Sequence, residues 1–424
     1  MRILVYSANF APEPTGIGKY SGDMAAWLAA QGHDVRVVAA PPYYPHWKRD
    51  PGYGRFSYRR EDWRGVRIWR APLWVPRSPG GLARVLHLLS FALSSFPVML
   101  RQAFWRPDLV LSVAPAFVCA PTALLVARLC GAKAWLHLQD FEVDVAFRMG
   151  LLKGKLLQRL VLHVERSLLG RFDRVSSISR RMVERLVAKG VRPERTHLFP
   201  NWVDLTDFDI RPDPAAYRAE LGIDATAKVV LFSGSLGGKQ GLMVIPAIAK
   251  LLAKREDIVF VVCGSGIMKR QLELATAGLA NVILLPLQPI ERLGSLLAMA
   301  DMHLLPQNPD AADLVLPSKL SGMLASGRPV IASCHAGTEI ATVISSCGIV
   351  VRPGDVIEWR DAVCQLADDA ALRRRLGAAA RMVAAEQFER NAVLKKMFAA
   401  AEAPVDGALP ETTARLPVVQ RPIV

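Results

Sequence analysis

The sequence predicts an α/β protein built from two successive domains, each a parallel sheet with helices wound on both sides. Three observations support this. The chain has 424 residues, more than one hydrophobic core usually serves. Short apolar runs alternate with helical patterns in two separate series, as in parallel sheets. A composition of 51% hydrophobic residues with 30 Gly and 29 Pro is typical of a fold with many tight turns between strands and helices.

The first series opens as a βαβ unit. Residues 3–7 form an apolar strand, Gly16 and Gly18 follow in a loop, residues 20–30 have a helical pattern and residues 35–39 form a second strand. Helical patterns separate most of the further strands, which are expected at residues 66–69, 109–113, 134–138, 175–178 and 197–199. We therefore expect a first, doubly wound domain over residues 1–200.

The second series follows an aperiodic segment at residues 201–214, which we interpret as a linker. Strands are expected at residues 229–233, 259–263, 282–285, 302–305, 330–332 and 349–351, with helices around 242–253, 269–277 and 358–367. The second domain is thus expected over residues 215–385. A C-terminal helix at residues 386–402 could return to the first domain, and the proline-containing tail at 403–424 is expected to be disordered.

Charge is distributed unevenly along the chain. Residues 1–197 carry 30 Lys and Arg against 14 Asp and Glu, whereas the remainder carries 23 against 24. The basic half is either a set of solvated helix faces or a surface for anionic lipid or another polyanion. The six cysteines form no CxxC pair and lie in apolar stretches, which predicts buried thiols in a reducing compartment, without disulfides or a zinc site. The N-terminus has the pattern of a strand and not of a signal peptide, so we expect a cytoplasmic protein.

The longest apolar segment, residues 85–100, is shorter than the roughly 20 residues that cross a bilayer and contains a histidine and a proline. Three arginines and four aromatic residues lie in or beside it: Arg84, Phe91, Phe96, Arg101, Phe104, Trp105 and Arg106. Such a helix either packs in the core or lies in a membrane interface. The second alternative predicts a peripheral protein on the inner face of the cytoplasmic membrane, with its anionic surface as a partner.

In each domain, a glycine loop follows the first strand. Gly16 and Gly18 form either a structural turn or a loop that faces substrate, because the third glycine falls one position too late for a dinucleotide fingerprint. In the second domain, Gly234, Ser235 and Lys239 belong to the loop SGSLGGKQG, which lacks P-loop spacing. Backbone amides and a lysine at a helix start can bind a diphosphate, although a solvated turn lysine remains the alternative. Gly264 and Gly266, which follow the next strand, are expected on the same donor-binding side.

Polar residues also follow the strand at residues 134–138. His137 and Asp140 should emerge at the carboxyl end of the sheet, where α/β proteins place their sites. His137 could orient a hydroxyl or act on charge developing at a sugar, and Asp140 could bind hydroxyl groups. Asp207 and Asp209 match a metal-binding DxD by spacing, but they lie in the expected linker, where chance is the simpler explanation, and no metal site is predicted.

Together these segments resemble the retaining glycosyltransferases of family 4, and among them the type found in colanic acid synthesis. The resemblance covers nearly the whole chain up to about residue 400. It is carried by the segments YSANFAPEPTGIGKYSGDMAAWLAAQGHDVRVV, APPYYPHWK, LHLLSFALSSFPV, LHLQDFEVD, FPNW, SGSLGGKQG, LPSKLSGMLASGRPVI and GTEI.

The resemblance implies a GT-B fold and a transfer that needs neither a metal nor another cofactor. Nucleotide diphosphate sugar would be the donor, with front-side attack and retained configuration, and a lipid-linked saccharide would be the acceptor in the first domain. Gly16 and Gly18 would then lie near the donor phosphates and acceptor. His137 would match the active-site histidine, Lys239 the diphosphate-binding lysine and Glu339 a glutamate near the donor sugar.

The chain also departs from this family at two positions. Ser235 stands where most members have an arginine, and Gly322 where they have the second glutamate of a Glu-x7-Glu pair. Ser318 and Lys319 precede that second position and are expected at the donor site, where Lys319 could help to meet the phosphate charge.

Two other function classes compete with this one. A nucleotide-sugar epimerase or dehydrogenase would need a carboxylate after the second strand and a YxxxK pair, and the first domain has neither. A non-catalytic polyanion or nucleic-acid binding protein would explain the basic half, but it would leave the lysine loop of the second domain without a role. No nucleic acid is therefore expected as a partner.

Overall fold

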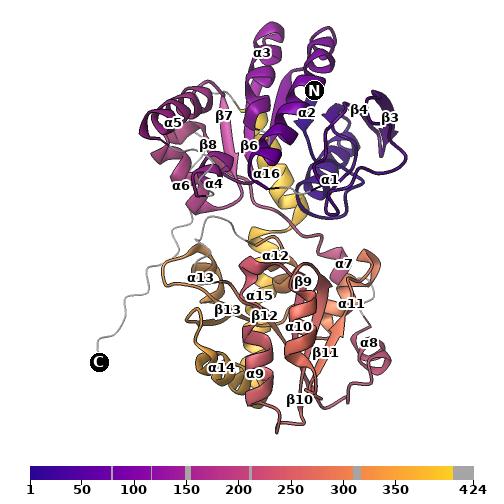
Figure 1. Ribbon diagram of the computed structural model, residues 1–424, viewed down its shortest axis with the longest axis vertical. Coiled ribbons are helices and arrows are strands. Elements are labelled where there is room, and N and C mark those ends of the chain that lie inside the picture. Colours follow the sequence, from indigo (N-terminus) through magenta and orange to yellow (C-terminus); the bar gives the residue numbers. More distant parts are fainter. Residues whose placement is uncertain (78–79, 116, 149–153, 210–212, 309–316, 404–424) are drawn as a thin grey trace.

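The computed structural model describes residues 1–77, 80–115, 117–148, 154–209, 213–308 and 317–403, with the side chains of residues 145, 146, 148, 155 and 239 excepted. It has the predicted class: two α/β domains lie one above the other, each with a central sheet between helices (Figure 1). The upper domain in that view contains the indigo and magenta part of the chain, and the lower domain contains the orange part.

The first domain is built on an eight-stranded sheet in the order β3-β4-β2-β1-β5-β6-β7-β8. All neighbours pair in parallel except β3 and β4. The strands are β1 (Arg2–Ser7), β2 (Asp34–Ala39), β3 (Arg59–Trp63), β4 (Val66–Arg70), β5 (Leu109–Ala114), β6 (Lys133–Leu138), β7 (Arg174–Ser177) and β8 (Thr196–Leu198). The inner strands are buried on both faces, which is why they are continuous apolar runs in the sequence.

The edge strand β3 is not predicted from the sequence. It is the charged segment RREDW and forms an antiparallel hairpin with β4. Arg64 and Gly65, the two residues of its turn, both have positive φ (46° and 78°), as a tight primed turn requires. Its charged side chains suit an edge exposed to water and hide the hydrophobic alternation by which strands are found.

Helices cover both faces of this sheet and create two apolar cores. They are α1 (Gly16–Ala30), α2 (Gly81–Ala103), η1 (Phe117–Cys119), α3 (Ala120–Cys130), α4 (Glu142–Arg148), α5 (Lys155–Leu169), α6 (Arg180–Ala188) and η2 (Pro193–Arg195). One core includes side chains of α2, α3 and α6, and the other includes α1 together with residues from the end of the chain.

α2 is longer than the apolar run that marks it in the sequence. Among the described residues it is the one helix of sufficient length and hydropathy to cross a membrane. His87, Phe91, Ser95 and Met99 form a buried stripe along it at intervals of four residues. In this fold α2 therefore packs one side against the domain and lies on its surface.

The second domain is built on a six-stranded parallel sheet in the order β11-β10-β9-β12-β13-β14. The strands are β9 (Lys228–Ser235), β10 (Ile258–Ser265), β11 (Val282–Leu285), β12 (Met302–Leu305), β13 (Val330–Ser333) and β14 (Gly348–Val351). The helices are α7 (Thr206–Asp209), α8 (Pro214–Glu220), η3 (Gly238–Gln240), α9 (Val244–Leu251), α10 (Lys269–Thr276), η4 (Ile290–Arg292), α11 (Leu293–Ala298), α12 (Lys319–Ala325), α13 (Glu339–Ile344), α14 (Val356–Asp368) and α15 (Ala370–Gln387).

The last helix, α16 (Arg390–Glu402), belongs to the first domain. In yellow, it rises from the lower domain into the upper one (Figure 1), and its buried side chains join the core that contains β1, β2 and α1. The chain thus crosses between the domains twice, and the two crossings run side by side: Val203 N donates to Phe388 O (2.8 Å) and Arg390 N donates to Val203 O (3.0 Å).

Candidate functional site

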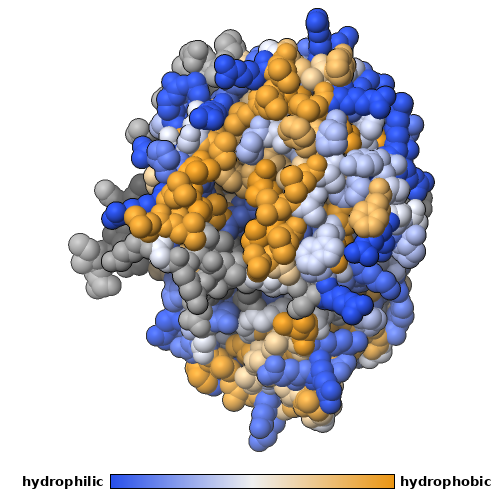
Figure 2. All heavy atoms as spheres, turned by 45° about the horizontal axis from the view of Figure 1, so that its top comes forward, coloured by the Kyte–Doolittle hydropathy of each residue, from blue (hydrophilic) through white to orange (hydrophobic). Residues whose placement is uncertain are grey.

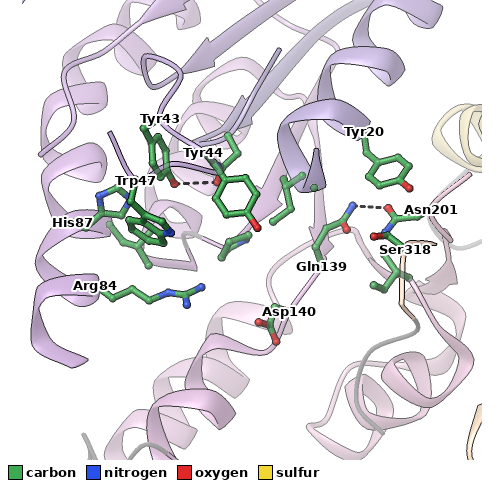
Figure 3. Close-up of a pocket in the computed structure, with 16 residues that line it drawn as sticks. Tyr20, Tyr43, Tyr44, Trp47, Arg84, His87, Gln139, Asp140, Asn201 and Ser318 are labelled. Carbon is green, nitrogen blue, oxygen red and sulfur yellow. Dashed lines mark hydrogen bonds between the residues drawn. The ribbon is translucent and has the colours of Figure 1, made fainter. Parts of the chain in front are cut away.

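A pocket of about 250 Å³ lies at the carboxyl end of the first sheet, where it faces the second domain. Its wall comes mostly from loops after β1, β2 and β6 and from the start of α2, and α12 of the second domain is reached through Ser318 (Figure 3). The lining residues are Asn9, Gly16, Ile17, Tyr20, Tyr43, Tyr44, Trp47, Arg84, His87, Leu88, Pro115, Gln139, Asp140, Ile178, Asn201 and Ser318.

A buried carboxylate holds one side of this pocket in place. Glu13 is 4% exposed, and it accepts hydrogen bonds from the backbone amides of Tyr43 and Tyr44 (both 3.1 Å) and from Asn9 Nδ2 (3.0 Å). Burial raises the pKa of Glu13, while these hydrogen bonds oppose the rise. Glu13 thus fixes the tyrosine loop and does not itself line the pocket.

The two glycines of the first loop have different structural roles. Gly16 begins α1 with a φ of +63°, a left-handed conformation that favours glycine, and it lines the pocket. A Cβ on Gly18 would come within 2.3 Å of Glu13 Oε2, so Gly18 is needed for close packing of α1 on the buried carboxylate. Only Gly16 of the two predicted residues is therefore part of the pocket wall.

The adjoining wall, formed by the loop after β2 and the start of α2, combines aromatic rings with one cation. The ring of His87 lies 4.8 Å from that of Tyr43 and 5.3 Å from that of Trp47, and its Nδ1 contacts Trp74 O at 2.6 Å. Arg84 lies nearly one turn earlier on α2 and points toward the cavity (Figure 3). Within the described residues Arg84 makes no ion pair. No local pattern in the sequence predicts this wall, although Tyr43, Trp47 and His87 lie in segments that carry the family resemblance.

His137, which is expected to act on the substrate, lies behind the wall of this pocket. It is 3% exposed; its Nδ1 lies 2.9 Å from Ser176 Oγ, and Gln139 Nε2 donates to its Nε2 (3.1 Å). Burial lowers the pKa of His137 to about 3, so the ring is neutral. Because Nε2 accepts a hydrogen bond, the ring proton belongs on Nδ1 and is donated to Ser176.

Gln139 takes the position that His137 was expected to occupy. Its amide nitrogen donates both to His137 and to Asn201 Oδ1 (3.1 Å), as the dashed line in Figure 3 marks for the second bond. Both amide protons are thus used, and Oε1 is left to accept from a ligand hydroxyl. Asp140 follows at the pocket wall, as predicted, and its Oδ1 accepts from Phe141 N (2.8 Å).

The segment of the second glycine loop begins in the last residues of β9, where Gly234 has a φ of +134° that excludes most side chains. Gly264, near the end of β10, and Gly266, just after it, allow this loop to pack closely. A Cβ on Gly264 would lie 1.9 Å from Gly234 O, and one on Gly266 would lie 2.4 Å from Leu236 O. Gly264 and Gly266 therefore support the loop from behind. Ser235 is exposed, and the side chain of Lys239 lies outside the described part of the structure.

Lys319 lies directly against this loop. A Cβ on Gly234 would be 3.4 Å from Lys319 Cδ and 3.9 Å from its Nζ. The preceding residue, Ser318, is in the pocket wall. Ser318 and Lys319 thus connect the pocket of the first domain with the glycine loop of the second. Gly322, on the same helix, faces Leu297 and lies outside the pocket lining.

Glu339 faces the first domain, but at a different point. As the first residue of α13, it accepts hydrogen bonds from the backbone amides of Arg180 (to Oε1, 2.8 Å) and Arg181 (to Oε2, 3.0 Å) at the start of α6. Glu339 therefore forms a contact between the domains and is not part of the pocket wall.

Comparisons with known proteins agree with this architecture. Residues 15–202 match the family model "Glycosyl transferase 4-like domain", and residues 227–369 match "Glycosyl transferases group 1". The chain is 40% identical over 409 residues to the "Putative colanic acid biosynthesis glycosyl transferase WcaI" of Escherichia coli K12, which covers 94% of this chain and 99% of that protein.

Solved structures with the same fold are more distant in sequence. Sucrose-phosphate synthase from Thermosynechococcus elongatus superimposes with a TM-score of 0.69 at 20% identity, covering 94% of this chain and 97% of that one. Anabaena HepE in complex with UDP-glucose superimposes with a TM-score of 0.65 at 15% identity, covering 94% and 98%.

Proposed function

The chain belongs to the GT-B glycosyltransferases with a family-4-like first domain, and from this premise we propose that it moves a sugar from a nucleotide diphosphate sugar to a lipid-linked saccharide in the synthesis of a colanic-acid-like exopolysaccharide. One observation carries the proposal. The pocket at the carboxyl end of the first sheet is joined, through Ser318 and Lys319, to the glycine loop at the carboxyl end of β9. Two substrates bound at these places would meet between the domains.

The donor is assigned to the glycine loop on chemical grounds. A loop that approaches a ligand through backbone amides, carries Lys239 in its sequence and has Lys319 packed against it suits the diphosphate group. HepE, which shares the fold, has been solved in complex with UDP-glucose. The acceptor is assigned to the first-domain pocket, where aromatic rings can pack against a sugar and Arg84 supplies a cation for an anionic group.

We propose a front-side transfer with retained configuration. The acceptor hydroxyl attacks the anomeric carbon on the face from which the diphosphate leaves, the bond to the diphosphate breaks, and a departing phosphate oxygen takes the hydroxyl proton. Lys239 and the loop amides stabilise the charge that develops on the diphosphate, so that no metal ion is required. Gln139 and Asp140 position the acceptor hydroxyls, while His137 holds Gln139.

A donor screen tests the proposal. Purified protein is incubated with UDP-, GDP- and dTDP-sugars, with and without a chelator, and release of the nucleotide diphosphate is measured. We expect one donor class to be hydrolysed slowly in the absence of acceptor, and chelation to leave the rate unchanged. Hydrolysis of none of these donors, with no binding of them either, would refute a sugar-nucleotide transferase, and a strict need for Mg²⁺ or Mn²⁺ would refute the metal-independent mechanism.

Within this assay, Lys239→Ala should lower turnover at saturating donor by about a hundredfold, since a positioned cation at a developing negative charge contributes a few kcal/mol to transition-state stabilisation. Lys250→Ala is the matched control, because Lys250 is exposed in the last turn of α9, at the end of the helix that is farther from the loop in the sequence. Equal turnover in the Lys239 variant and the wild type would remove Lys239 from the site.

We further propose that the first domain docks on the inner face of the cytoplasmic membrane. Figure 2 shows apolar side chains gathered in bands over the first domain, with a hollow between them. The exposed apolar residues of this domain come chiefly from α2 (Leu82, Val85, Leu86, Leu89, Leu93 and Phe96) and α5 (Leu156, Leu157, Leu160, Leu162 and Val164). α5 adds Arg159 and Arg166 to the arginines already noted around α2. A helix with exposed apolar and basic side chains suits an anionic interface.

This docking predicts salt-sensitive binding to anionic liposomes. Each basic residue near an anionic surface contributes about 1 kcal/mol and is screened by salt, so cosedimentation should fall between about 0.05 M and about 0.5 M salt. Leu93→Glu on α2 and Leu160→Glu on α5 should each reduce binding. Leu274→Glu on α10 is the control, because Leu274 is 71% exposed, against 76% for Leu93 and 60% for Leu160. Equal sedimentation with anionic and neutral liposomes, or none with either, would contradict electrostatic docking.

A further inference from the structure

Lys319 stands apart from the other buried polar groups of the described structure. Several arginine and histidine side chains have one buried nitrogen without a hydrogen bond, but each has another nitrogen that is bonded. The amine of Lys319 has a single nitrogen, it is buried, and it has no hydrogen-bond partner. A methionine would fill the same space without the cost of removing an amine from water. The lysine is therefore costly to the fold in the absence of a ligand.

The surroundings of this amine are apolar on one side and open to the loop on the other. Its Nζ lies 4.0 Å from the centroid of the Phe232 ring, a contact that favours the protonated form. On the other side is Gly234, where the missing side chain leaves the amine next to bare backbone. In the same loop, Gln240 Oε1 is also buried without a partner. Two unsatisfied polar groups thus lie at one loop, which indicates a polar ligand.

The position of Lys319 indicates the chemical class of the ligand. An amine beside a glycine loop at the carboxyl end of a parallel strand is suited to an anion. Because the preceding Ser318 borders the acceptor pocket, an anion held here lies between the glycine loop and that pocket. In a glycosyl transfer that place belongs to the leaving diphosphate.

We infer that Lys319 is a buried counter-charge for the diphosphate of the donor, an assignment that rests on the proposed function and adds to it a second cation besides Lys239. When the diphosphate enters, the amine gains the hydrogen-bond partners that it lacks in the free protein. Lys319 therefore lowers the stability of the ligand-free protein and raises its affinity for nucleoside diphosphates.

This role entails uptake of a proton on binding. Burial lowers the pKa of Lys319 to about 7 in the free protein. No described ionisable group on β9, α12 or the facing pocket wall, Tyr20 and Asp140 included, contributes to this shift; the loop itself carries Lys239. A bound diphosphate raises that pKa again. Above pH 7, binding must then draw a proton from solvent, so affinity should fall as the pH rises from 7 to 9, and below pH 7 this dependence should vanish.

The test measures binding of UDP, GDP and dTDP, and of the matching nucleosides, by isothermal titration calorimetry. The protein variants are wild type, Lys319→Met, Lys319→Arg and the surface control Lys250→Met. Lys319→Met should weaken binding of the nucleoside diphosphate by at least about thirtyfold and leave binding of the nucleoside unchanged. Lys319→Arg should bind the diphosphate with little pH dependence. At pH 8, titrations in two buffers of different ionisation enthalpy should show proton uptake in the wild type and none in Lys319→Arg.

Thermal unfolding distinguishes this role from a structural one. The unliganded Lys319→Met protein should have a Tm equal to or above that of the wild type, because an unpaired buried amine has been removed. A lower Tm, equal loss of nucleoside and diphosphate affinity, or unchanged diphosphate affinity would each overturn the inference while leaving the proposed function intact. If the wild type binds none of the three diphosphates, the proposed function fails and this inference fails with it.

Discussion

Removing residues 390–424 is expected to leave the first domain unable to fold, although the deletion lies at the far end of the chain. α16 supplies Leu394, Met397 and Ala401 to the core formed by β1, β2 and α1. Its carboxyl end is held by Lys133, whose Nζ donates to the carbonyls of Ala401, Glu402 and Ala403 (2.9–3.0 Å). Without the helix, part of the sheet face that α1 and α16 cover together is exposed to water, and burial of such a face provides most of the stability of a domain.

Expression of the truncated chain should therefore yield insoluble or protease-sensitive protein. The control removes only residues 404–424 and keeps α16, so it should unfold at the Tm of the full chain. A single substitution provides a graded measurement: Leu394 is fully buried, and Leu394→Ala should lower the free energy of unfolding by about 2–5 kcal/mol. A folded first domain in the protein that lacks α16 would contradict this view of the core.

The second large effect is expected at Lys189, which joins α4, α5 and α6. Its Nζ lies 2.6 Å from Glu165 Oε2 and 3.0 Å from Asp144 Oδ1. The side chains of both carboxylates are at most 7% exposed, and Arg185 pairs with Asp144 as well (2.7 Å). Lys189→Met removes the only cation paired with Glu165 in the described structure. An unpaired buried carboxylate costs about 3–5 kcal/mol, which should appear as a lower free energy of unfolding in urea.

The sign of the pH dependence follows from Glu165. Burial raises the pKa of Glu165, even though Lys189 opposes the rise. In Lys189→Met the pKa of Glu165 rises further. At a pH above this raised pKa the buried carboxylate is charged and destabilises the folded protein. As the pH falls, the carboxyl takes up a proton and this destabilisation disappears. The variant should thus lose more stability at pH 8 than at pH 5. The double variant Lys189→Met/Glu165→Gln should recover much of the loss; an equal loss at both pH values would show that the charge is not the cause.

The fold class can be predicted from the sequence because most strands are recognisable from their own residues. Strands such as β1 and β5 are buried on both faces and appear as apolar runs, and glycines mark the turns that follow. β3 was missed because charged residues on an edge strand need no hydrophobic alternation. The apolar face of α5 was missed too, since leucines at helical spacing are equally typical of a core helix.

The site could be predicted only in part. Glycine loops and polar residues after strands indicated the edge of the sheet at which the pocket lies, but not which side chains face the pocket. His137 and Gln139 are two residues apart, near the end of a strand buried on both faces, so alternation does not separate the wall from the layer behind it. The aromatic wall with Arg84 depends on contacts between α2 and the loop after β2, and no local pattern encodes such a contact.

The paired crossings between the domains constrain how the enzyme can move. A single connecting strand would let one domain both bend and twist relative to the other. Here the two crossing segments are hydrogen-bonded side by side through Val203. Twisting one domain against the other would break these bonds, whereas bending both segments together, about an axis perpendicular to them, would keep the bonds. We therefore expect closure to be mainly a bend about this axis, which would bring the pocket and the glycine loop together in the same register on each closure.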